Sequence, residues 1–429
     1  MDMPQLPAYS AEKFLNREDL INPIKEMAVK ILGGKRKPED PNVITLRGER
    51  ATGKTWLALH LVRTVLPQIP GVEPLLISLV PTLEPGYIPQ GTIVRKNERF
   101  FDKESSKDPD EFCVETIKWV AGVLDTTTAE KASASELSHW LVRDIKQKHS
   151  QKLIALILDS VFETNWDYLK KLEEYLLVPL AALPNSLIVM TGRGNSYPWV
   201  SPYLRITDEQ RLGVLADEYL EKIIKEKTAQ TGLTLEMVKE ISGGNPGIAY
   251  LIAQSKDLDE IKSNLNYIAN LLLDITSMKN DSKIREYFEA LCVLDGFDED
   301  EIGYMFSKYY DNIDYEIWTD DQKRTIKKKM LETNLIRWEN GKYLMDTSAR
   351  RVLEKYLEFQ NRDKWARLHQ GAKDLYENWA KHFSKHANFF NAKAKRHNDI
   401  LEKAGYLQKN VPLQKSPHPK TKKQIEKTV

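Results

Sequence analysis

The feature that most constrains this chain is one eight-residue segment, Gly48-Glu49-Arg50-Ala51-Thr52-Gly53-Lys54-Thr55. An apolar run at residues 43–46 precedes it, and a stretch with helical apolar periodicity follows at residues 56–66. Glycines with this spacing let the backbone curl so that successive N–H groups face one anion, and the dipole of the following helix adds positive potential there. The segment therefore predicts a buried strand, a phosphate-binding loop and a helix, in that order.

The residue types in this loop indicate a nucleoside triphosphate bound together with Mg²⁺. A lysine in the position of Lys54 reaches the β- and γ-phosphates, and a hydroxyl in the position of Thr55 binds the metal ion. We expect ATP or ADP with Mg²⁺ as cofactors, held by these residues: Gly48, Arg50, Ala51, Thr52, Gly53, Lys54, Thr55 and Trp56. The alternative is a glycine-containing turn that carries a surface lysine.

Asp159 is the candidate second ligand of the metal ion, because it directly follows the apolar run at residues 153–158. In P-loop enzymes the loop Ser/Thr and an aspartate of this kind hold Mg²⁺ together. The alternative role is a helix N-cap.

Ser160 stands where many hydrolysing P-loop ATPases carry a carboxylate, so Glu163 is the nearest candidate base. A first-turn glutamate favoured by the helix dipole explains Glu163 equally well, and slow or absent hydrolysis is expected.

Arg193 is the fourth candidate catalytic residue, beside Lys54, Asp159 and Glu163. It ends the segment Thr191-Gly192-Arg193, which follows an apolar run at residues 187–190. The carboxyl ends of parallel strands converge on the ligand crevice, where a guanidinium can pair with the γ-phosphate. An ordinary loop arginine is the alternative.

The first half of the chain alternates continuous apolar runs with helical stretches. The runs lie at residues 43–46, 75–80, 153–158 and 187–190, and the helical stretches at 56–66, 112–124, 136–148 and 168–177. Continuous apolar runs are typical of strands buried on both faces. The pattern predicts an α/β fold, a P-loop NTPase parallel sheet with helices on both faces. Residues 85–109 are polar and predict a long loop.

The second half is expected to be helical. Residues 217–255 form a helical pattern broken at 243–247, and residues 259–277 predict a helix pair. Three short helices, at 284–294, 299–308 and 321–332, lead into two runs joined by Asn340-Gly341, a strong hairpin signal. Three helices followed by a hairpin predict a winged-helix domain after a helical lid domain. More helices follow to about residue 407, and disorder is expected beyond it.

Composition restricts the compartment and the partners. The longest aliphatic run, at residues 153–158, is far shorter than the roughly 20 residues of a membrane span. The N-terminus lacks a secretory signal, and two cysteines make neither a disulfide framework nor a zinc site, so a cytoplasmic protein without a membrane partner is expected. Residues 381–429 hold 12 Lys and Arg against 3 Asp and Glu, a balance of +9. This tail predicts either a nucleic-acid contact or a solvated, disordered end.

The order of the motifs resembles that of the STAND ATPases, the class of the NB-ARC and NACHT switches. Five segments carry the resemblance: Phe14-Leu15-Asn16-Arg17-Glu18, the P-loop, Leu158-Asp159-Ser160-Val161-Phe162-Glu163, Thr191-Gly192-Arg193 and Gly244-Asn245-Pro246, with a winged-helix end at 335–356. The resemblance implies that Phe14, Leu15 and Arg17 lie along the base and sugar, and that Pro246 packs on the nucleotide. It covers residues 14–356.

The chain departs from this class in two ways. Met345-Asp346-Thr347 stands where NB-ARC switches have Met-His-Asp, and an aspartate does not donate to phosphate unless it is protonated. Arg350 or Arg351 is the candidate substitute, and a solvated helix face is the alternative. The few residues before Phe14, and about fifty structured residues after the winged helix, predict a switch core without its own effector or repeat sensor.

Two functions remain open on the sequence. The first is a nucleotide-gated signalling or defence switch, which changes conformation with ATP or ADP and acts by self-association or through separate effector and sensor proteins. The second is an AAA+-like DNA-associated ATPase that uses the winged helix and the tail at 381–429. The expected domains are 1–13 (extension), 14–212 (P-loop domain), 213–280 (lid), 281–356 (winged helix), 357–407 (C-terminal helices) and 408–429 (basic tail).

Overall fold

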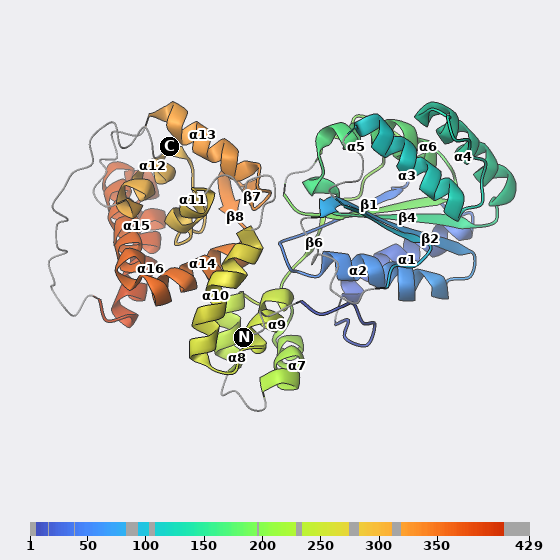
Figure 1. The fold of residues 1–429 in the computed structure, drawn as a ribbon. Helices are drawn as coiled ribbons and strands as arrows, with labels where there is room; N and C mark the ends of the chain where they lie inside the picture. The colour runs from blue at the N-terminus through green and yellow to red at the C-terminus, as the bar shows by residue number, and fades with distance from the viewer. Residues whose placement is uncertain are drawn as a thin grey trace. The chain divides into compact units, whose positions relative to one another are not determined.

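The computed structural model describes residues 6–15, 17–37, 39–82, 93–102, 108–194, 197–228, 234–273, 283–310 and 319–406. The chain divides into two compact units, each described by itself here (Figure 1). The sheet unit comprises Gln5–Ile223 and Gly244–Tyr250. The helical unit comprises Ile224–Gly243 and Leu251–Val429, with Met1–Pro4.

The sheet unit is built on six parallel strands in the order β3-β2-β4-β5-β1-β6. Their bounds are β1 Val43–Gly48, β2 Val72–Thr82, β3 Glu98–Asp102, β4 Leu153–Asp159, β5 Ser186–Gly192 and β6 Gln210–Leu212. The four apolar runs of the sequence are confirmed as β1, β2, β4 and β5. Because β5 lies between β1 and β4, the carboxyl ends of these three strands are neighbours.

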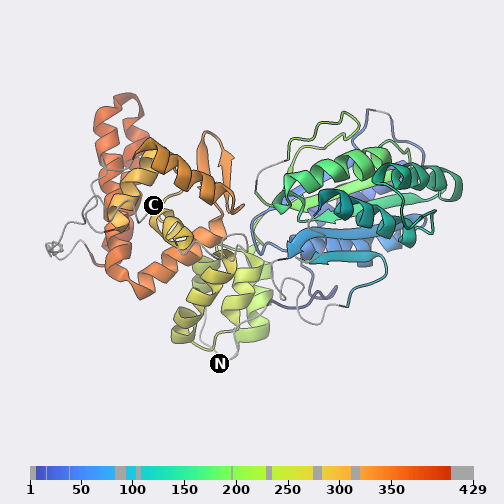
Figure 2. The ribbon, with the colours of Figure 1, turned by 45° about the horizontal axis from the view of Figure 1, so that its top comes forward.

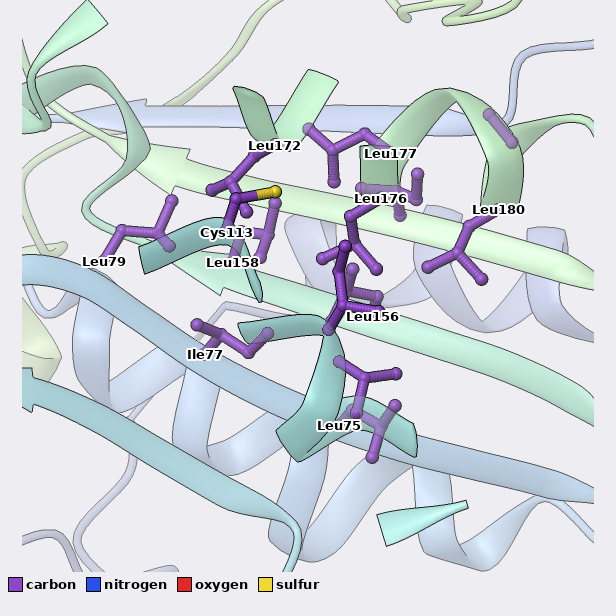
Figure 3. Close-up of a cluster of buried hydrophobic side chains, with 14 of the residues drawn as sticks. Leu75, Ile77, Leu79, Cys113, Leu156, Leu158, Leu172, Leu176, Leu177 and Leu180 are labelled. Carbon is purple, nitrogen blue, oxygen red and sulfur yellow. The ribbon is translucent and has the colours of Figure 1, made fainter. Parts of the chain in front are cut away.

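Helices cover both faces of this sheet, as the sequence predicts (Figure 1). One face carries α1 Glu18–Leu32, α2 Lys54–His60, and the short turns η1 Leu61–Val65 and η2 Leu66–Gln68. The other carries α3 Pro109–Val123, α4 Ala134–Lys148, α5 Trp166–Leu172, η4 Glu173–Leu177 and α6 Val178–Ala181. On the second face, Ile77 and Leu156 point into a core with Leu176 and Leu180 (Figure 3). The alternate residues Leu76 and Ile157 enter the opposite core, so the α/β class is confirmed.

The expected loop at residues 85–109 is wrong in part, because it contains β3. β3 has only five residues, of which Phe100 and Phe101 alone are apolar, so the sequence offers neither a continuous apolar run nor an alternating pattern. Glu98 is buried at its start because both carboxylate oxygens accept hydrogen bonds from Arg63, at 2.5 Å each. This pairing, made between distant parts of the sequence, anchors an edge strand that composition alone assigns to a loop. β6 has only three residues and was also not predicted.

The helical unit holds the lid helices and the winged helix. The lid elements are α7 Asp217–Thr228, α8 Leu235–Ser242, α9 Pro246–Ala253 and α10 Leu258–Leu273, of which α7 and α9 cross between the units. Residues 259–277 were expected as a helix pair, but the described part, to residue 273, is the single helix α10. No Gly or Pro interrupts the apolar spacing in this helix, so it continues. The expected boundary at 280–281 lies outside the described residues.

The winged-helix arrangement is present as predicted. Its elements are α11 Ile284–Leu291, α12 Glu299–Tyr309, α13 Asp320–Leu331, β7 Ile336–Glu339 and β8 Lys342–Met345. Asn340 and Gly341 connect the antiparallel strands with φ of 51° and 78°, the positive values that a type I′ turn requires.

Three longer helices complete the described chain: α14 Thr347–Gln360, α15 Arg362–His382 and α16 Ala387–Lys403. A short turn, η7 Ser384–His386, joins α15 to α16, and the two helices pack side by side (Figures 1 and 2). Lys355 of α14 pairs with Glu240 of α8 at 2.5 Å, which ties the winged helix to the lid inside this unit. The tail expected at 408–429 lies outside the described residues.

Two further expectations concern compartment. Within the residues that the structure describes, no helix is both long and apolar enough to cross a membrane. Cys113 and Cys292 are buried free thiols.

Candidate nucleotide-binding site

The loop between β1 and α2 has the backbone shape that its glycines predict. β1 ends at Gly48, and Lys54 is the first residue of α2. Ala51 and Gly53 both have left-handed conformations, with φ of 61° and 92°. A Cβ on Gly48 would lie 2.6 Å from Thr52 Oγ1. Glycine is therefore needed at Gly48 for space and at Gly53 for backbone conformation.

Lys54 lies inside the curve of this loop. Its Nζ donates hydrogen bonds to the carbonyl oxygens of Gly48 at 3.0 Å and Glu49 at 2.7 Å, and the residue is 8% exposed. Thr52 Oγ1 also donates to Glu49 O, at 2.8 Å. An ammonium has three donors and no fixed fork, so it can exchange these carbonyls for phosphate oxygens without moving its stem far.

Thr55, Asp159 and Thr191 meet at the ends of the central strands. Thr55 Oγ1 donates to Asp159 Oδ2 at 2.7 Å, and Thr191 Oγ1 makes a short hydrogen bond to Asp159 Oδ1. Adjacent ligands of an octahedral Mg²⁺ lie about 2.9 Å apart, because each bond is about 2.1 Å long. The oxygens of Thr55 and Asp159 therefore fit two adjacent positions around Mg²⁺, and Thr191 orients the carboxylate.

Glu163 and Arg193 form one buried pair, although the sequence predicts separate roles for them. Arg193 N donates to Glu163 Oε2 at 3.0 Å, and Arg193 Nε lies 3.2 Å from Glu163 Oε1. Burial raises the pKa of Glu163, and the positive charges of Arg193 and Lys54 counteract part of this shift. A Cβ on Gly192 would lie 2.6 Å from Phe162 Cδ2, so glycine there permits the close approach.

One donor of Arg193 remains unused. Its Nη1 is buried and has no hydrogen-bond partner in the described part of the chain, while the whole residue is 7% exposed. Buried donors are rarely left unpaired in native structures. An unpaired guanidinium N–H can donate a hydrogen bond to an anion. Arg193 directly follows β5, and β5 is the neighbour of β1, the strand that leads into the P-loop.

A segment of the lid, residues 244–250, belongs to the sheet unit and lies against the loop. Asn245 Nδ2 donates to Arg50 O at 2.7 Å, and Gly247 N donates to Ala51 O at 3.1 Å. A Cβ on Gly247 would lie 2.7 Å from Ala51 O, so only glycine allows this approach. The segment thus binds the backbone of the residues expected to cradle phosphate.

Asn245 also begins α9. Its Oδ1 accepts from Gly247 N at 3.1 Å and from Ile248 N at 3.2 Å, as an N-cap does. Pro246 follows as the first residue of the helix, where its fixed φ is favourable. The cap therefore holds Pro246, the expected nucleotide contact, next to the loop.

The residues before the loop support its backbone. Arg17 Nη2 donates to Thr52 O at 3.2 Å and to Gly213 O at 2.9 Å, and the side chain is buried. The ring of Phe14 stacks on His60 with centroids 4.0 Å apart. Arg17 therefore supports the backbone of the loop, and its place along the base and sugar stays a prediction.

Two other expected cofactor residues, Leu15 and Trp56, are half-buried. The Trp56 ring meets that of Tyr9 edge-on at 5.5 Å. The site also contains Thr191, Asn245 and Gly247, to which no individual role was assigned from the sequence. The sequence signal is their place in or next to the quoted motifs, since Thr191 precedes Gly192-Arg193, Asn245 precedes Pro246 and Gly247 directly follows it.

The stretch Met345-Asp346-Thr347 has a structural role in the helical unit. Asp346 caps α14, because its Oδ1 accepts from Ser348 N at 3.1 Å. Arg350 lies 3.5 Å from Asp295 Oδ1, and Arg351 Nη1 donates to a backbone carbonyl of α8 at 3.4 Å. Both candidate arginines therefore have partners within the helical unit, and neither is a solvated side chain on a bare helix face.

The cations on α13, a helix of the winged-helix arrangement that the DNA-associated alternative uses, are partly neutralised. Lys327 makes a short ion pair with Glu299, and Lys323 Nζ lies 3.5 Å from Asp320 Oδ1. Duplex binding depends on Lys and Arg charges that are available to phosphates. These pairs reduce the positive charge that α13 offers, whereas Lys328 on the same helix is exposed.

No protein-family profile matches the chain, and no curated protein matches it. Solved structures resemble it at low identity. CDC6P from Pyrobaculum aerophilum is 13% identical, with 80% of this chain and 94% of that chain covered and a TM-score of 0.40. The ORC2 protein of Aeropyrum pernix is 11% identical, with 83% and 97% covered and a TM-score of 0.41. A STAND protein with a tetratricopeptide repeat sensor from Pyrococcus horikoshii is 14% identical, with 95% of this chain and 56% of that chain covered and a TM-score of 0.33. At these values, function has to be argued from the site itself.

Proposed function

We propose that this chain is an ATP/ADP-binding molecular switch of the STAND type, with slow or absent hydrolysis. The observation that carries the proposal is the meeting of three features at one loop. These are the Thr55–Asp159 oxygen pair at 2.7 Å, the unused buried donor of Arg193, and the lid segment bound through Asn245. Together they provide a metal site, a sensor for phosphate and a connection to the rest of the lid.

Each loop residue has a role in this proposal. Lys54 exchanges its two carbonyl partners for β- and γ-phosphate oxygens, and the backbone N–H groups of the loop bind the same phosphates. Thr55 and Asp159 hold Mg²⁺, which neutralises phosphate charge when it is bound. Nη1 of Arg193 contacts the γ-phosphate, so this arginine distinguishes ATP from ADP.

Slow hydrolysis follows from the pairing of Glu163. A general base has to lie within hydrogen-bond reach of the water it activates and have a free acceptor. Both oxygens of Glu163 are engaged by Arg193. Glu163 can take a proton from water only after this pair opens, so the resting geometry favours binding over turnover.

The lid segment offers a route from the nucleotide to a conformational change. Asn245 and Gly247 bind carbonyl oxygens of the loop itself, so a rotation of the loop peptides on phosphate binding strengthens or breaks these bonds. The chain on either side of residues 244–250 belongs to the helical unit. A ligand shifts such an equilibrium by its differential affinity for the two states. The outputs in this proposal are self-association or the binding of separate effector and sensor proteins in the cytoplasm.

The test begins with the nucleotide that co-purifies with the full chain, identified by ion-pair chromatography. Light scattering after size exclusion then follows assembly with ADP, with ATP and Mg²⁺, and with a non-hydrolysable ATP analogue. We expect bound ADP in the smaller species and assembly with ATP. The analogue should act like ATP, because the proposal requires binding and not turnover.

Lys54→Ala is the test variant and Lys25→Ala, an exposed lysine on α1, is its matched control. Lys54→Ala should lose nucleotide and remain in the smaller species, whereas Lys25→Ala should behave like the wild type. Loss of nucleotide without any effect on assembly would overturn self-association as the output. Retention of nucleotide by Lys54→Ala would overturn the site itself.

A further inference from the structure

The turn between α15 and α16 is basic and contains no acidic residue. Residues 378–398 hold no Asp or Glu and five Lys or Arg: Lys381, Lys385, Lys393, Lys395 and Arg396. Charged surfaces of globular proteins usually mix both signs. Arg396 is paired with Asp295, so the lysines carry the positive charge at this turn. A lysine-rich stretch without acidic residues at the tip of a helical hairpin indicates an anionic partner.

Two phenylalanine rings are exposed at the same turn. Phe383 and Phe389 are each 53% exposed, unlike most large apolar side chains of the described residues. Phe390, half-buried behind them, contacts both, with ring centroids 6.1 Å from Phe383 and 5.4 Å from Phe389. Trp379 supports Phe390 at 5.4 Å. The two exposed rings therefore pack against Phe390, which in turn packs against Trp379.

One lysine, Lys393, lies beside an exposed ring, and two others are close to Phe383 in the sequence. Lys393 Nζ is 5.1 Å from the centre of the Phe389 ring and donates to Tyr376 Oη at 3.4 Å. Lys381 and Lys385 are exposed, and neither forms an ion pair within the described part of the chain. Rings that offer a flat face and cations without counter-ions are thus combined on one short segment.

We infer that this turn, which we call the hairpin tip (residues 379–393), binds single-stranded nucleic acid. Its exposed rings stack on bases and its lysines contact the phosphates, the combination that single-strand-binding surfaces use. Ser384, Asn388 and Asn391 add hydrogen-bonding groups at the tip. Duplex DNA would not satisfy the rings, because its bases are already stacked. This inference is independent of the nucleotide switch proposed above.

A lipid surface is the competing anionic partner, and the tip fits it less well. Helices that lie in a membrane interface carry a long apolar face of many residues. Here five residues separate the two exposed rings, and four of the five are polar: Ser384, Lys385, His386 and Asn388. The experiment distinguishes the two partners directly.

The test measures fluorescence anisotropy of labelled oligothymidine and oligouridine of about 20 nucleotides with the full chain, over a series of KCl concentrations. The double variant Phe383→Ala/Phe389→Ala should bind about tenfold more weakly or worse at every salt concentration, with the salt slope unchanged. Lys381→Gln/Lys385→Gln should instead reduce the slope of log K against log[KCl] by about 1.4, since each single-strand phosphate contact contributes about 0.7. A duplex of the same length should not respond to the phenylalanine changes.

Tyr203→Ala is the matched control, because Tyr203 is 57% exposed and lies in the sheet unit. It should bind as the wild type does, and thermal unfolding should confirm that all variants are folded. Unchanged binding by the phenylalanine variant would overturn the inference. Binding of phosphatidylserine vesicles that depends on the two rings, without oligonucleotide binding, would also overturn it and assign the tip to a membrane.

The basic residues beyond 406 could bind nucleic acid by charge alone, so the site has to be located as well. Residues 407–429 contain no Phe, Tyr or Trp. An oligonucleotide carrying 5-iodouracil cross-links to stacked aromatic residues on irradiation. Cross-links in peptides that contain Phe383 or Phe389 would support the hairpin tip, whereas cross-links confined to residues 407–429 would overturn it.

Discussion

Glu163 and Arg193 are held together by two contacts, an N–H bond of 3.0 Å from the Arg193 backbone and a 3.2 Å ion pair to its Nε. The pair joins the end of β5 to η3, the turn Val161–Glu163 that follows β4. It therefore connects the strand that carries Asp159 with the proposed phosphate sensor. Removing one charge of this pair should change both the stability of the protein and its response to ATP.

Replacement of Glu163 by Gln should destabilise the free protein by about 3 kcal/mol, because it leaves a buried guanidinium without its counter-ion. ATP with Mg²⁺ should restore much of this loss, since the γ-phosphate supplies the missing charge. The increase in Tm on adding ATP should therefore be larger for Glu163→Gln than for the wild type. Differential scanning fluorimetry with ATP and with ADP measures it.

Glu173→Gln is the control for this prediction. Glu173 is also buried, and its Oε1 accepts hydrogen bonds from Val200 N and Ser201 N at 2.8 Å, away from the P-loop. Removing the charge of Glu173 should lower Tm, and ATP should raise the Tm of this variant no more than it raises that of the wild type. An equal ATP response in both variants would contradict the proposed contact between Arg193 and the nucleotide.

Thr191→Val should weaken the affinity for Mg²⁺ in the presence of ATP by about tenfold or more, because it removes the hydroxyl that orients Asp159. The side chains have nearly the same shape, so packing is conserved. Thr45→Val on β1 is the matched control, since Thr45 Oγ1 is buried without a partner in the described residues. Titration calorimetry of ATP with and without EDTA should show the difference only when Mg²⁺ is present, and only for Thr191.

The parts of this site that are local in sequence were predictable. The strand, glycine loop and helix around Lys54 follow from spacing and apolar pattern, because each requirement is met within a dozen residues. The pairing of Glu163 with Arg193 was not, since it depends on β4 and β5 lying side by side. The same holds for Arg17, whose guanidinium binds the backbone of Thr52 and Gly213. Hydrogen bonds from a side chain to a distant carbonyl leave no periodic signal.

Gly247→Ala should lower the affinity for ADP, because the added Cβ would lie 2.7 Å from Ala51 O and 2.8 Å from Ala51 Cβ. The loop or the lid segment has to move to relieve this contact. Gly122→Ala on α3 is the control, because a Cβ there has no atom within 4 Å. It should raise stability by about 0.5–1 kcal/mol and leave ADP affinity unchanged. Fluorescent-ADP titration and thermal unfolding together test the pair.

Glu98→Gln should destabilise the sheet unit by about 3 kcal/mol, because Arg63 would lose the carboxylate that holds it at 2.5 Å in a buried position. Glu115→Gln is the surface comparison, since its pair with Arg99 is at 3.2 Å and the Glu115 side chain is 42% exposed. An exposed pair contributes less than about 1 kcal/mol. Chemical unfolding should therefore give a clearly lower free energy of unfolding for Glu98→Gln than for Glu115→Gln. Similar free energies of unfolding for the two variants would show that β3 does not depend on the buried pair.

His397 should make the helical unit sensitive to acid. Burial, followed by the charge of neighbouring His369, lowers the pKa of His397 to about 2, and the two rings share a hydrogen bond of 2.9 Å between their Nδ1 atoms. Below its ordinary pKa of about 6.5, the unfolded chain binds a proton that the folded chain does not. Stability is therefore complete above about pH 6.5 and decreases towards lower pH, by about 2 kcal/mol at about pH 5.

His397→Asn should remove this dependence, so that its free energy of unfolding changes less than that of the wild type between about pH 6.5 and pH 5. Other charges close to His397 are Arg396, Lys393 and Arg350, all positive, and they act in the same direction. His382→Asn is the control for replacing a histidine, because His382 is exposed in the same unit. If urea titrations gave the same pH slope for His397→Asn as for the wild type, the acid sensitivity would have to come from other groups, because the pair with His369 could not then be its source.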